Sequence, residues 1–133
     1  MTPTISVGKR SVQLLRIMVS GIFLLAGFNH LIEVDKTVSR IEMAQFKGFA
    51  HFFGNLELLV IISGIVMLAA GFSFLLCFKT RWAAIILLLV LIPITITIQI
   101  GQINSMGPLF KNIAIAGGLL FFILNDIKTF KKQ

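Results

Sequence analysis

The chain has one cysteine, Cys77, and few charged residues. A single thiol cannot form an intrachain disulfide, a Cys-x-x-Cys redox pair or a metal cluster. Charged residues make up only 13% of the 133 positions, and five residues are acidic. The sequence also lacks a phosphate-binding loop, a nucleophile paired with a base, and any metal motif. It therefore predicts no independent enzyme and no metal site.

Apolar residues dominate what is present. They form 57% of the sequence, and the mean hydropathy is +0.99. A soluble domain of this size could not hide so much apolar surface, whereas a lipid bilayer accepts it. We therefore expect one all-α domain over residues 1–133, an integral membrane four-helix bundle. The stretches long enough to span lie at about 11–32, 55–77, 82–103 and 108–126.

Residues 33–54 form the longest connection between these stretches. Their apolar residues recur at near-helical spacing, with cations on the other side of the pattern. This is typical of an amphipathic helix at a membrane interface, so we expect an interfacial segment between the first two spans. Pro93 lies inside the third stretch and is expected to kink it, which membrane helices tolerate when neighbours satisfy the freed carbonyl.

The net charge of +7 follows from cations at the ends of the apolar stretches, which favours membrane topology over nucleic-acid binding. Seven cations fall on one side and three on the other: Lys9, Arg10, Lys79, Arg81, Lys128, Lys131 and Lys132 against Lys36, Arg40 and Lys47. The bias places both termini in the cytoplasm, most simply of a bacterial cytoplasmic membrane. Residues 33–54 and 104–107 then face outward.

Two charged residues lie near the outer ends of the apolar stretches. Lys111 falls in the first turn of the fourth stretch, and Glu57 is the acidic residue of the second. A charge within hydrocarbon costs about 2.5–3.5 kcal/mol on insertion scales, so we expect the two to pair. Polar residues of all four stretches share this depth, and we predict a ligand-binding site of Glu57, Lys111, His30, Asn29, Asn55, Gln99, Gln102 and Asn112.

Structural roles compete with this prediction. Glu57 and Lys111 can neutralise each other without any ligand, and Gln99 and Gln102 can bond one helix to another. His30 suits a hydrogen bond at the interface as well as a proton relay. Near the cytoplasmic side, Arg16 is expected to extend toward water or to form a structural ion pair with Asp126. The Phe-rich run 118–122 is taken as lipid-facing.

These residues resemble the DoxX family of small four-helix membrane proteins. The similar segments are RIMVSGIFLLAGFNHL in the first stretch, an early Glu in the second, and GPLFKNIAIAGGLLFF in the fourth. The most specific run is KN-x-A-x-x-GG-L-L at 111–120, whereas many members have Lys where this chain has His30. The resemblance implies the fold and an association with membrane redox systems, including a quinone-linked thiosulfate oxidoreductase subunit. A quinone is the one cofactor that it suggests.

Three functions remain open. The chain is a subunit of a redox assembly that binds a quinone-like or lipid amphiphile at the outer site, a scaffold for other membrane proteins, or a carrier of small lipophilic molecules. Redox partner proteins and a homo-oligomer fit the first two. A dry, packed core would favour the scaffold, and a cavity open to both sides would favour the carrier. A one-sided pocket favours the bound amphiphile, since a pore would need polar lining along its length.

Overall fold

The structure is a computed structural model that describes residues 3–43, 48, 52, 54–99 and 106–125. Its helices are α1 (Lys9–Ile32), α2 (Val34–Glu42), α4 (Leu56–Leu75), α5 (Thr80–Ile94), the π-helix η1 (Thr95–Gln99) and α6 (Met106–Leu124). Within the described residues, four segments are long and apolar enough to cross a membrane: Lys9–Ile32, Leu56–Leu75, Thr80–Thr97 and Met106–Leu124. The predicted all-α membrane bundle is confirmed.

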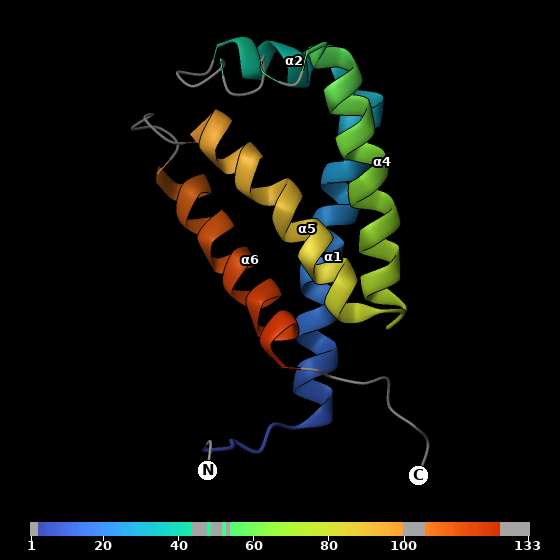
Figure 1. The fold of residues 1–133 in the computed structure, drawn as a ribbon, viewed down its shortest axis with the longest axis vertical. Coiled ribbons are helices and arrows are strands. Elements are labelled where there is room, and N and C mark those ends of the chain that lie inside the picture. Colours follow the sequence, from blue (N-terminus) through green and yellow to red (C-terminus); the bar gives the residue numbers. More distant parts are fainter. Residues whose placement is uncertain (1–2, 44–47, 49–51, 53, 100–105, 126–133) are drawn as a thin grey trace.

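The four long helices run alternately up and down (Figure 1). α2 lies across one end of the bundle, where α1 ends, α4 begins, α5 leads into η1 and α6 begins; we call this the α2 end. The start of α1 and the finish of α6 lie at the opposite end. The predicted third span, 82–103, starts two residues earlier, at Thr80, and is described as far as Gln99.

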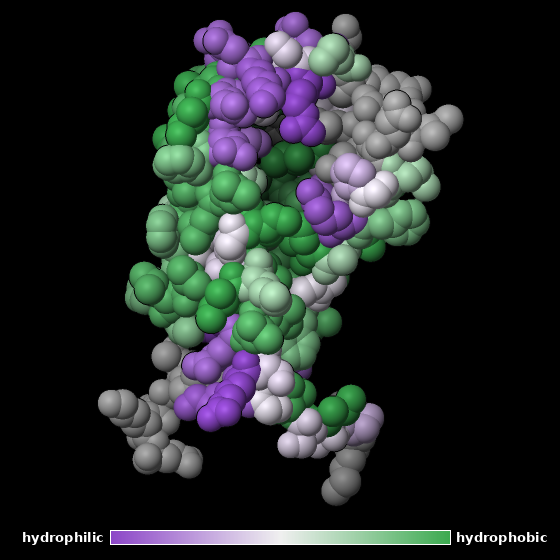
Figure 2. Space-filling model, turned by 180° about the vertical axis from the view of Figure 1, so that it is seen from behind, coloured by the Kyte–Doolittle hydropathy of each residue, from purple (hydrophilic) through white to green (hydrophobic). Residues whose placement is uncertain are grey.

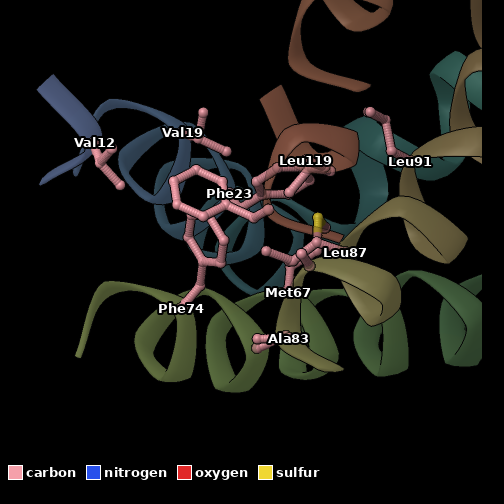
Figure 3. Close-up of a cluster of buried hydrophobic side chains, with 12 residues drawn as sticks. Val12, Val19, Phe23, Met67, Phe74, Ala83, Leu87, Leu91 and Leu119 are labelled. Carbon is pink, nitrogen blue, oxygen red and sulfur yellow. The ribbon is translucent and has the colours of Figure 1, made fainter. Parts of the chain in front are cut away.

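The apolar core lies toward the opposite end of the bundle and joins all four spans (Figure 3). Phe74 of α4 and Phe122 of α6 meet edge to face, with ring centroids 4.8 Å apart. Leu119 and Phe122 are almost fully buried, so the prediction that 118–122 faces lipid is wrong for these two. Part of that run turns inward because the buried stripe of α6 consists of Asn112, Leu119 and Phe122.

α1 and α4 form the most extensive helix pair of the bundle, and they approach most closely at two glycines. A Cβ placed on Gly27 would lie 2.9 Å from the carbonyl oxygen of Gly64. One placed on Gly64 would lie 3.0 Å from the oxygen of Gly27 and 3.0 Å from the Cβ of His30. Small residues allow such close packing between membrane helices, so this crossing fixes where His30 meets α4.

α5 passes into η1 just after Pro93. Proline has no N–H for the helical ladder, and wider π-turns are frequent at such interruptions and at functional sites. The hydroxyl of Thr95 donates to the carbonyl of Leu91 at 2.8 Å. It also accepts from the buried Asn112 amide of α6 at 2.9 Å. This pair of hydrogen bonds ties the interrupted helix to α6.

The glycine crossing gives a direct test of the packing. Gly27→Ala should lower the free energy of unfolding by about 1–3 kcal/mol, the usual cost of overpacking, because the new methyl group meets backbone rather than a movable side chain. Gly21→Ala is the matched control on the same helix, since nothing lies within 4 Å of its added Cβ. Denaturant titration in mild detergent measures both, and equal effects would contradict the close crossing.

Candidate functional site

α2 covers the α2 end by packing its apolar side on α4. Ile41 is buried against Leu56 and Val60, with Val34 and Val38 partly buried beside them. The cations of α2 lie on its exposed side. The predicted amphipathic segment is therefore confirmed over Val34–Glu42, while positions 44–47, 49–51 and 53 lie outside the described residues.

An apolar cavity of about 230 Å³ lies beneath α2. Aliphatic residues of α4 and α5 form most of its wall, and polar groups enter at few points. Its lining residues are His30, Thr37, Ile41, Leu59, Val60, Ile62, Ser63, Val66, Leu89, Val90, Pro93, Ile94 and Thr97. Ligand pockets have this composition, a mostly apolar wall with a small number of polar groups. We call this space the apolar cavity.

His30 provides the best-defined polar contact of the apolar cavity. Its Nδ1 lies 3.0 Å from the Ser63 hydroxyl, and that hydroxyl donates to the Val60 carbonyl at 2.8 Å. A hydroxyl has one proton, and a carbonyl can only accept. The arrangement that satisfies both contacts has His30 Nδ1–H donating to Ser63. Nε2 of a neutral imidazole is then a hydrogen-bond acceptor.

A second, basic cavity of about 360 Å³ opens on the other side of His30, between α1, α2 and the start of α6. Figure 2 shows hydrophilic surface on either side of a hollow near the α2 end, with apolar surface within it. The lining residues are Ile22, Leu25, Ala26, Asn29, His30, Glu33, Lys36, Thr37, Arg40 and Lys111. His30 and Thr37 line both cavities, so the two spaces adjoin. We call the second space the basic cavity.

The cations of the basic cavity are unequally paired. Lys36 Nζ lies 3.4 Å from a carboxylate oxygen of Glu33. Within the residues that the structure describes, Arg40 and Lys111 form no ion pair. Both side chains are exposed to the cavity mouth. Among the described residues, no carboxylate therefore pairs with Arg40 or Lys111.

Three of the predicted site residues meet in this cavity: Lys111, His30 and Asn29. Glu57 does not join them, and the predicted ion pair between Glu57 and Lys111 is not formed. Glu57 is an exposed residue in the first turn of α4, and α4 packs mainly on α1, α5 and α2. The carboxylate beside the cations is that of Glu33 instead.

Local helix chemistry accounts for the other predicted polar residues. The side chain of Asn55 caps α4 by accepting from the backbone N–H of Glu57 at 2.9 Å and of Leu58 at 3.4 Å. A carboxylate in the first turn then interacts favourably with the helix dipole. Asn112 bonds to Thr95, as described above. Gln99 ends η1, and Gln102 lies outside the described residues.

Glu33, Lys36, Thr37, Arg40 and Ser63 line the cavities but were not predicted as site residues from the sequence. The cations of α2 were placed opposite its apolar residues, and Lys36 and Arg40 are exposed in the structure, but they also border the cavity. The spacing of Lys36 and Arg40, four residues apart, was a usable signal, because it places both on one helical face. Nothing in the sequence showed that Lys111 of α6 would complete the set.

Arg16 is the most deeply buried charge in the described residues, with a relative exposure of 2%. Its guanidinium carbon lies 5.9 Å from the ring centroid of Phe74 and 5.4 Å from that of Phe122. Nε, Nη1 and Nη2 form no hydrogen bond to any described residue. The expectation that Arg16 reaches toward water is therefore wrong, because aromatic rings enclose it. Asp126, its predicted partner, lies outside the described residues.

Within the described residues, four apolar spans run in alternating directions, an amphipathic helix lies across one end, and an apolar and a basic cavity lie at that end. These features define a small polytopic membrane protein. A family model described as DoxX matches residues 11–100. The chain belongs to the DoxX family. No significant match was found among curated proteins or among solved structures.

The environment of Arg16 generates a prediction about its partner. A buried guanidinium needs an acceptor, and losing one member of a buried pair typically costs about 3–5 kcal/mol. Arg16→Met and Asp126→Asn should each lower the unfolding free energy, and the double variant should recover part of the loss. Additive effects in this cycle, or a rise in stability for Arg16→Met alone, would show that the two do not pair.

Proposed function

We propose that the chain binds a small amphiphile at the α2 end of the bundle, with the apolar part of the ligand in the apolar cavity and its polar head at His30. The observation that supports this most strongly is that the two cavities adjoin at His30 and Thr37. An amphiphile needs such a pairing of apolar and polar space. A tightly packed scaffold would offer neither.

The size and wall of the apolar cavity suit a ring or an alkyl segment. Its volume of about 230 Å³ exceeds the roughly 150 Å³ of apolar cavities that admit benzene. Nε2 of His30 can accept a hydrogen bond from a hydroxyl-bearing head. The quinol form of a quinone-like molecule, or a lipid with a hydroxyl in its headgroup, therefore fits the description, and membership of a membrane redox assembly would follow from the first.

Filling the apolar cavity should remove the ligand. Val66 lines the cavity, so Val66→Phe places a ring in the space that the tail would occupy. Ile65→Phe is the matched control, because Ile65 is adjacent on α4, is 54% exposed and is not part of the lining. Native mass spectrometry from gently solubilised membranes should show a retained small molecule in the control and a several-fold loss in Val66→Phe. Equal retention would contradict the proposal.

We further propose that the α2 end faces away from the cytoplasm, in a bacterial cytoplasmic membrane, with both termini inside. The seven-to-three distribution of cations supports this orientation. Thr4→Cys and Asp35→Cys, each in a Cys77→Ser background, place a thiol at an exposed position at either end of the bundle. An impermeant maleimide added to intact cells should label the Asp35→Cys variant and leave the Thr4→Cys variant unmodified. Labelling of both variants, or the reverse pattern, would contradict the orientation.

A further inference from the structure

The described residues that line the basic cavity carry a net positive charge. Among the residues that the structure describes, Lys36, Arg40 and Lys111 line it with a single carboxylate, that of Glu33. Glu33 pairs with Lys36, whose Nζ lies 3.4 Å from a carboxylate oxygen of Glu33. With His30 neutral, the cavity holds two excess positive charges, and these belong to Arg40 and Lys111.

Keeping these cations together has a cost. Lys36 and Arg40 lie four residues apart on α2, a spacing at which like charges destabilise a helix. Lys111 approaches the same space from α6, so the repulsion also acts between helices. A bound anion would reduce the repulsion within α2 and the repulsion between α2 and α6.

The location of the cations points the same way. Under the proposed orientation, the α2 end faces outward, where Lys and Arg are scarce in membrane proteins. Two of the three cations that the sequence places in outer connections line the basic cavity, together with Lys111, the lysine of α6. Topology does not explain this concentration, whereas ligand charge does.

We propose that the basic cavity binds the phosphate group of an anionic phospholipid. Arginine can bind two phosphate oxygens at once, and lysine adds a point charge. The wall of the cavity also includes Ile22, Leu25 and Ala26, which would contact the lipid below its headgroup. This inference rests on the proposed function, since the adjoining apolar cavity would hold part of an acyl chain. A quinone head, which is neutral, would leave Arg40 and Lys111 uncompensated.

The test measures headgroup selectivity. Purified protein is placed in nanodiscs of equal phosphatidylglycerol and phosphatidylcholine, released into mild detergent, and its retained lipid is identified by native mass spectrometry. Wild type should retain phosphatidylglycerol in excess. Arg40→Gln and Lys111→Gln should each reduce the ratio roughly tenfold, the usual effect of one charge-assisted hydrogen bond. Arg10→Gln and Arg81→Gln are controls of equal charge change at exposed positions near the opposite end, and they should leave it unchanged.

A second arm of the experiment distinguishes a phospholipid headgroup from free phosphate as the bound group. Inorganic phosphate at millimolar concentration should not displace the lipid from wild type; displacement, with no preference between the two lipids, would overturn the phospholipid assignment in favour of a free anion. If the double variant Arg40→Gln/Lys111→Gln keeps the lipid selectivity of wild type, the phospholipid assignment is overturned. Retention of a quinone without phospholipid would also overturn it.

The same experiment distinguishes this inference from the proposed function. Val66→Phe should reduce the total amount of retained lipid, whereas the Arg40 and Lys111 variants should change only which lipid is retained. If Val66→Phe has no effect while the cationic variants lose selectivity, the tail assignment fails and the phosphate site stands. The opposite pattern leaves the amphiphile pocket and removes the phosphate site.

Discussion

The close crossing of α1 and α4 at Gly27 and Gly64 is the constraint on which the α2 end depends. Without side chains at these positions, the two backbones come near enough for His30 of α1 to lie against Ser63 of α4. His30 then stands where the apolar and basic cavities meet. A packing feature, the absence of two Cβ atoms, thereby sets the geometry of a polar site. The two glycines therefore position His30 against α4 by allowing a close approach of the backbones.

The sequence was sufficient to predict the class of the fold and most of its boundaries. The lengths of the apolar stretches predict the spans, because a helix must stay apolar across the thickness of the lipid. Pro93 marked where α5 passes into the π-helix η1. The inward faces were less predictable. On α6, Lys111 was predicted to pair with Glu57, yet the buried residue at that level of the helix is its neighbour Asn112. A single position of rotation separates them, about 100° on a helix, and hydropathy alone cannot resolve it.

The predicted site residues that the structure describes lie at the α2 end, but only Asn29, His30 and Lys111 line the basic cavity. Glu57 was predicted to pair with Lys111 because both charges lie within apolar stretches. The ends of α4 and α6 that hold them lie apart, however (Figure 1). Asn55 and Glu57 instead begin α4 in the usual manner of a cap and a first-turn acid. The missing cations came from α2, whose position over the bundle follows from the burial of Ile41 against α4. Such tertiary placement is invisible in a single sequence.

The central claim is that the α2 end holds an amphiphile across the two adjoining cavities. An experimental structure of the protein purified in native lipid tests it most directly. We predict continuous density with its polar end between Arg40 and Lys111 and its apolar end along Val66 and Pro93, passing beside His30. A map in which side chains close both cavities, with no density between these residues, would contradict the claim.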